Sequence, residues 1–173
     1  MIKLLILEKP ELKDYWYEQK LESDPNTMSY NKGYIVSYDG YHYDTGCIDF
    51  PKEKWKEKYE KRKKQNEVFY YLKDTKTNEY VGYANYSYNK KENRYYCGIV
   101  IEYEKRGKGY AKEGLKLLCE RAKENKIKAL YDNFEKERNC FQLFKELGFY
   151  VVEETTYKKM GKEVKGVVVK KDL

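Results

Sequence analysis

The sequence predicts an α+β fold in which helices are layered on a mostly antiparallel sheet. Two observations predict it. Three strand-like runs rich in Tyr, Val and Ile follow one another at residues 67–73, 79–88 and 95–101, with only short polar turns between them. A glycine-rich turn then leads into residues 110–123, where Ala, Leu, Leu and Ala recur at helical spacing at positions 111, 115, 118 and 122.

The flanking segments complete the predicted order β-α-α-β-β-β-α-β-α-β-β. Pro10 stands where helices often begin, and Gly148 stands where the last helix would end. The other predicted elements are strands at 2–7, 127–131, 150–157 and 163–169, a helix that begins at Pro10, and helices at 51–64 and 135–147.

Residues 22–50 differ from the rest of the chain, because they hold glycines, a proline and tyrosines in no sustained period. A long aromatic loop in a compact domain is usually functional. Its aspartates, at positions 24, 39, 44 and 49, give it an acidic character. It also contains His42, the only histidine, whose side chain has the unperturbed pKa that suits a general base.

The composition indicates one domain over residues 1–173 and argues against several classes of function. The net charge is +7, but acidic and basic residues are interleaved, so we expect no nucleic-acid partner. The four cysteines show no paired spacing, which predicts free thiols, no metal site and a cytoplasmic protein. The apolar start is too short for a signal peptide, and no stretch approaches the length of a membrane span.

The turn Arg106-Gly107-Lys108-Gly109 has the features of an anion site. A glycine turn that enters a helix at Tyr110 leaves several backbone N–H groups unpaired at the positive end of the helix dipole. The dinucleotide fingerprint lacks its third glycine here, and the Walker loop lacks its Lys-Ser/Thr pair. A plain strand-to-helix turn with exposed lysines is the alternative interpretation.

A third pattern fits better. Arg106, Gly109 and Ala111 match Q/R-x-x-G-x-G/A, the acetyl-CoA signature of the GNAT superfamily of N-acetyltransferases, and residues 143–149 resemble its second signature. The chain resembles this family over residues 66–157, its expected cofactor-binding core, and more weakly before them. The resemblance implies a sheet whose fourth and fifth strands splay apart. It also implies transfer of an acetyl group from acetyl-CoA to a primary amine by direct attack on the thioester.

The resemblance also implies site residues. The backbones of Ile99 and Ile101 would pair with the pantetheine arm, and the backbone amides from Arg106 through Ala111 would hold the pyrophosphate. Asn139 lies near the family's pantetheine-binding asparagine, although strict counting from Gly148 puts Glu137 there. The expected cofactor-binding residues are therefore Ile99, Ile101, Arg106, Gly107, Lys108, Gly109, Tyr110, Ala111 and Asn139.

The catalytic groups depart from the family pattern. Phe144 stands where relatives often carry a proton-donating tyrosine, and Tyr96 stands where many carry a glutamate. The candidates that remain are Tyr96 as the anchor of a water chain, His42 as a base and Tyr131 as an acid. A packing tyrosine and a histidine with no catalytic role are the alternatives for the first two.

The acceptor would be a small-molecule or protein amine, and residues 22–50 would form its wall. Carboxylates and aromatic faces there favour a cationic acceptor. Two other functions remain open at this point, a non-catalytic CoA or acyl-CoA sensor and a basic nucleic-acid-binding domain. The C-terminal hairpin offers an edge at which a homodimer could form.

Overall fold

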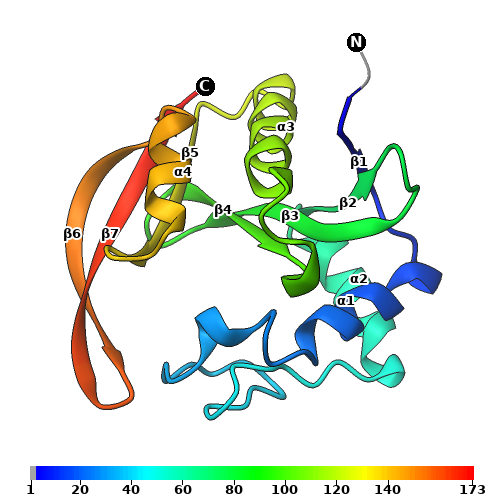
Figure 1. The fold of residues 1–173 in the computed structure, drawn as a ribbon, viewed down its shortest axis with the longest axis horizontal. Coiled ribbons are helices and arrows are strands. Elements are labelled where there is room, and N and C mark those ends of the chain that lie inside the picture. Colours follow the sequence, from blue (N-terminus) through cyan, green and yellow to red (C-terminus); the bar gives the residue numbers. More distant parts are fainter. Residues whose placement is uncertain (1–2) are drawn as a thin grey trace.

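The computed structural model describes residues 3–173, which form a seven-stranded sheet flanked by helices (Figure 1). The strand order is β1-β2-β3-β4-β5-β7-β6, and every pair is antiparallel except β4 with β5. The strands are β1 Leu5–Glu8, β2 Val68–Asp74, β3 Tyr80–Asn89, β4 Arg94–Ile101, β5 Ala129–Glu135, β6 Tyr150–Lys159 and β7 Lys162–Asp172. The predicted fold class is confirmed, while Ile2 of the predicted first strand lies outside the described residues.

The helices cover both faces of this sheet. Helices α3 and α4 lie on one face, and α1, α2 and the 22–50 segment lie on the other (Figure 1). Their bounds are α1 Trp16–Glu22, α2 Trp55–Lys64, α3 Tyr110–Glu124 and α4 Cys140–Glu146, with single 3-10 turns at 12–14, 29–31, 52–54 and 103–105. Within residues 3–173, no helix is both long and apolar enough to span a membrane.

Each face has its own core. Leu115 and Leu118 of α3 pack without exposure against the sheet, together with Leu72 and Leu130. On the opposite face a smaller cluster is mostly aromatic and consists of Tyr17, Leu21, Phe69 and Tyr71. The tyrosines thus supply the apolar area that the very polar composition lacks, while the Tyr17 hydroxyl donates to Glu102 and the Tyr71 hydroxyl donates to the Asp14 carbonyl.

Strands β4 and β5 separate soon after they meet. Their parallel ladder consists of the pairs Tyr95↔Leu130 and Tyr96↔Tyr131. Beyond these pairs β4 continues alongside β3 and β5 continues alongside β7. The predicted splay between the fourth and fifth strands is therefore present, and it opens toward the C-terminal ends of both strands.

Two predicted helix starts were wrong. Glu135 ends β5 rather than beginning a helix, because it pairs with Gly166 of β7, and α4 begins at Cys140. The chain after Pro10 forms a single 3-10 turn, in which the Glu11 N–H donates to the Asp14 carboxylate at 3.0 Å. The α-helix starts only at Trp16.

The tip of the β6–β7 hairpin touches the 22–50 segment. The Met160 N–H donates to the Gly33 carbonyl at 2.8 Å, and Tyr34 forms an isolated bridge with Lys159. The hairpin and this segment therefore enclose the same side of the sheet, the side opposite α3 and α4.

Candidate active site

The glycine turn after β4 is open and left-handed. Gly107 and Gly109 have φ values of +80° and +83°, a region that side chains with a Cβ avoid. A Cβ built at either position would meet no atom within 4 Å. The concave backbone of the turn is therefore accessible to a ligand.

The backbone amides of this turn are largely free. Within residues 3–173, no backbone or side-chain acceptor takes the N–H groups of residues 107–112. The Arg106 amide is the exception, since it donates to the Tyr103 carbonyl at 3.2 Å, so its predicted role as a free donor is wrong. The remaining amides converge at the N-terminus of α3, where the helix dipole favours an anion.

The Arg106 side chain has a structural role instead. Its Nε donates to the Ile101 carbonyl and its Nη2 donates to the Thr27 carbonyl, both at 3.0 Å. It thus fastens the chain that follows α1 to the end of β4.

Two neighbours of the turn differ in their surroundings. The Tyr110 hydroxyl donates to the Asp74 carboxylate, which fixes the start of α3 against the end of β2. Lys108 is exposed, as is expected of a solvated lysine. Ala111 lies in the first helical turn, where its amide has no partner within the helix.

The edge of β4 offers further hydrogen-bonding groups. The Glu102 N–H donates to the Val81 carbonyl of β3 at 2.9 Å. Because this direction alternates along an antiparallel strand, the N–H and C=O groups of Ile99 and Ile101 point toward the splay. The Ile101 carbonyl already accepts from Arg106, which leaves Ile99 with both groups available beyond the last β4–β5 pair.

Tyr96 and Tyr131 meet at the closed end of the splay. They are direct partners in the parallel ladder, and their ring centroids are 6.1 Å apart. The Arg94 guanidinium lies 4.4 Å from the centroid of the Tyr131 ring, with Lys170 on the same ring at 5.7 Å. Burial raises the pKa of the Tyr96 phenol, so it is a poor base in its resting state.

The other predicted residues lie elsewhere. His42 is exposed, and its Nε2 lies 2.9 Å from the Asp49 carboxylate within the same loop. Asn139 is exposed and directly precedes α4, where its side chain does not cap the helix. The structure brings Tyr96 and Tyr131 together and does not bring His42 into their contacts.

Phe144 belongs to the core. It is 2% exposed, and its ring centroid lies 5.1 Å from that of Phe134 and 4.8 Å from that of Phe149. The α4 position that would carry a tyrosine in relatives therefore contributes packing and no proton here.

Sequence reasoning missed Asp132. It is the first residue of β5 after the last pair with β4, and its strand was predicted to end at Tyr131. The residue keeps some exposure, but protein atoms surround its carboxylate, and this desolvation raises its pKa to about 7. The Asn133 amide at 2.8 Å and the charge of Arg138 oppose the increase without cancelling it. A carboxylate with this pKa, on the residue next to the last β4–β5 pair, suits proton transfer near neutral pH.

The model of the acetyltransferase (GNAT) family matches residues 35–149. The chain belongs to this family. A sequence search of curated proteins gave no match.

Solved structures of GNAT N-acetyltransferases share the fold. Spermidine N-acetyltransferase from Vibrio cholerae, in complex with CoA and spermine, superposes with a TM-score of 0.78 at 18% identity, covering 99% of this chain and 96% of that one. Ribosomal-protein-alanine N-acetyltransferase from Brucella melitensis gives 0.73 at 18% identity, with coverage of 97% and 99%. Phosphinothricin acetyltransferase from Sinorhizobium meliloti with acetyl-CoA gives 0.73 at 15% identity, with coverage of 98% and 89%.

The residues present fit the cosubstrate of this GNAT acetyltransferase, acetyl-CoA. The free amides of residues 107–112 are suited to hydrogen bonds with a pyrophosphate. The concave turn that they line, called the cradle below, is open at Gly107 and Gly109, and a Cβ at either position would narrow it. The free edge of Ile99 matches an amide-bearing arm that runs along β4.

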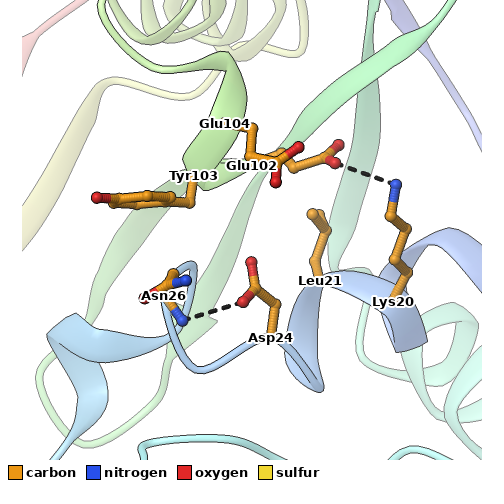
Figure 2. Close-up of a pocket in the computed structure, with 7 residues that line it drawn as sticks. All are labelled: Lys20, Leu21, Asp24, Asn26, Glu102, Tyr103 and Glu104. Atoms are coloured by element: carbon orange, nitrogen blue, oxygen red, sulfur yellow. Dashed lines mark hydrogen bonds and ion pairs between the residues drawn. The ribbon is translucent and has the colours of Figure 1, made fainter.

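A separate recess lies at the far end of β4 (Figure 2). It encloses about 250 Å³, and its lining includes the carboxylates of Asp24, Glu102 and Glu104 beside the ring of Tyr103. Glu102 is already paired with Lys20 at 3.0 Å. The recess is about 20 Å from Tyr96 along β4 at roughly 3.3 Å per residue.

Proposed function

We propose that this protein transfers the acetyl group of acetyl-CoA to a primary amine by direct attack of the amine on the thioester. One observation carries the proposal. The splay connects the free amides of the glycine turn, through the unpaired edge of β4, to Tyr96, Tyr131 and Asp132 at and beside its closed end. A single extended ligand can therefore be bound at one end and present a reactive group at the other.

Binding depends on the backbone more than on side chains. The amides of residues 107–112 would hold the pyrophosphate, and the N–H and C=O groups of Ile99 would pair with the pantetheine arm. Bound in this way, acetyl-CoA supplies an activated acetyl group. The side chains of Arg106 and Tyr110 support the shape of the site from behind.

The proton of the acceptor requires a base. A lysine-like amine has a pKa of about 10.4, so it must lose a proton before or during attack. Asp132 supports this role because its pKa is raised to about 7 by burial and it lies beside the last β4–β5 pair. Asp132 lies on the same face of β5 as Leu130 and Phe134 of the α3-side core, whereas Tyr96 projects from the other face, so water in the splay would connect the amine with the carboxylate.

The acceptor would enter on the face opposite α3, between the 22–50 segment and the β6–β7 hairpin. The acidic residues of that segment give weak support to a cationic acceptor, since several are engaged locally. Asp24 accepts from Thr27 at 2.6 Å, Asp39 pairs with Lys54 at 3.5 Å and Asp49 pairs with His42 at 2.9 Å. We therefore propose the primary amine as the acceptor class, with polyamines and peptide N-termini as the first compounds to assay.

Cofactor binding is tested by a matched pair of glycine variants. Gly109→Ala and Gly161→Ala both place a Cβ at positive φ, +83° and +75°, and neither Cβ meets an atom within 4 Å. Both should lose about 1–2 kcal/mol of stability. Only Gly109→Ala should weaken CoA binding, by at least tenfold in calorimetry, because only its methyl group enters the cradle. Equal CoA affinity in the two variants would refute the assignment.

Turnover is tested separately in the wild-type protein. We expect thiol release from acetyl-CoA that depends on the added amine, measured with a panel of polyamines, amino-acid amides and peptides. Tight CoA binding with no transfer to any amine would instead support the sensor function, for which the burial of Phe144 in the core is the favouring observation.

A further inference from the structure

Tyr157 of β6 holds a hydroxyl that the fold leaves without a partner. The oxygen is buried, yet no group in residues 3–173 donates to it or accepts from it. An unpaired buried hydroxyl costs about 1–3 kcal/mol, so such groups are uncommon unless they serve a ligand or a reaction.

The position of the ring shows where this hydroxyl points. In the sheet, β7 lies between β6 and β5, and Gly166 of β7 is the partner of Glu135 on β5. A Cβ on Gly166 would lie 2.0 Å from Cε2 of Tyr157 and 2.9 Å from its Cζ. The ring therefore crosses over Gly166 toward β5, and the hydroxyl, which Cζ carries, is directed toward the strand that borders the splay.

The surroundings of the ring place it on the acceptor side. The ring of Tyr34, from the 22–50 segment, meets it edge-on with centroids 6.1 Å apart. Tyr34 in turn donates to the Glu135 carboxylate on β5. Burial raises the pKa of the Tyr157 phenol, and the charge of Asp132 and the phenol of Tyr96 contribute further, so the hydroxyl lies within electrostatic reach of both. It consequently stays protonated over the working pH range.

We propose that Tyr157 donates the proton to the sulfur of the leaving thiol during acetyl transfer. This inference rests on the acetyltransferase function proposed above. It assigns a proton donor to a chain in which Phe144 occupies the α4 position and is packed in the core. The donor then comes from the opposite side of the splay, on β6.

The amine nitrogen forms a bond to the carbonyl carbon as the carbon–sulfur bond breaks, and the electron pair of that bond leaves with sulfur. The amine enters the step neutral, having lost its first proton to water. The proton that attack leaves in excess on nitrogen passes to the Asp132 carboxylate, and the phenol proton of Tyr157 passes to sulfur. Water then returns a proton to Tyr157 while Asp132 releases one, so both residues end the cycle unchanged.

The test is Tyr157→Phe, with Tyr150→Phe on the same strand as its control. The first change keeps the ring over Gly166 and removes only an unpaired hydroxyl, so the fold should be at least as stable as the wild type. Tyr150 is exposed, and its hydroxyl donates to Asp172 at 2.7 Å. We expect kcat to fall about 100-fold in Tyr157→Phe with unchanged KM for both substrates, and to be unaffected in Tyr150→Phe.

A binding measurement gives a readout other than activity. The wild type should bind CoA several-fold more tightly at pH 8 than desulfo-CoA, which lacks the sulfur, and this preference should disappear in Tyr157→Phe. A preserved preference, or a kcat within twofold of the wild type, would overturn the proposal. Failure of the proposed function gives a different result, since the wild type would then transfer no acetyl group to any amine. The comparison of CoA with desulfo-CoA would still test the contact between Tyr157 and sulfur.

Discussion

Replacing Asp132 with asparagine should raise the free energy of unfolding of this protein at pH 8 and lower its catalytic activity. The ordinary pKa of an aspartate is about 3.9, and burial raises that of Asp132 to about 7. Between these values the unfolded chain ionises before the folded one. The stability that the protonated carboxyl contributes is therefore complete below pH 4 and is lost as the pH rises through 7.

The magnitude follows from this difference in pKa. Each pH unit is worth about 1.4 kcal/mol, so the loss between pH 4 and pH 7 is at most roughly 4 kcal/mol. Asp132 keeps partial exposure, and solvent screening reduces the effect, so we expect about 2 kcal/mol. An asparagine cannot ionise, and the variant should therefore gain this amount over the wild type between pH 4 and pH 8.

Urea unfolding at pH 4, 6 and 8 measures the free energy of unfolding for both proteins. Subtracting the two curves removes the titration of all other groups, and Asp44→Asn, at an exposed loop position, is the control with a flat difference. The same variant should lose about 100-fold in kcat/KM, together with the acidic limb of its pH profile. A stability difference that does not change with pH would refute the burial argument, and a retained acidic limb would refute the assignment of the base.

Two further predictions concern the frame of the site. Glu18→Gln should destabilise the protein by about 3–5 kcal/mol in urea unfolding, because buried Arg62 would lose the 1%-exposed Glu18 carboxylate, which it contacts at 2.6 and 2.9 Å, and would keep only the longer pair with Glu67 at 3.8 Å. A loss below 1 kcal/mol, as is expected for the exposed control Glu124→Gln, would contradict this. Gly166→Ala should cost about 1–3 kcal/mol, since its methyl group overlaps the Tyr157 ring, and should lower calorimetric CoA affinity several-fold by moving the proposed hydroxyl contact away from the sulfur. A variant as stable as the wild type would show that the ring does not cross Gly166.

The fold and the open glycine turn were predictable because their signals are local. Alternating apolar residues define the strands, and the glycines at 107 and 109 indicate a turn with positive φ, which only glycine adopts easily. Arg106 shows the limit of this reasoning. Its side chain is fixed by the Thr27 carbonyl, a contact across many residues that no local pattern encodes.

The proposed catalytic residues were less predictable because long-range pairing decides their positions. The stretch around Asp132 resembles the end of a strand, yet β7 extends that strand to Glu135 and holds Asp132 within it, beside the last pair with β4. Tyr157 gave no local signal of its own. Its partner did, since a glycine inside a strand, as at Gly166, often marks a close approach by another group.

The contact between Gly33 and Met160 has a consequence for how this enzyme could change its acceptor. The proposed entrance for the amine consists of an early and a late part of the chain, which meet at the tip of the β6–β7 hairpin. Exchanging a few side chains at that junction would reshape the entrance for a larger or smaller nucleophile. The edge of β4 and the glycine turn, where we propose that acetyl-CoA binds, belong to neither part and would be unchanged.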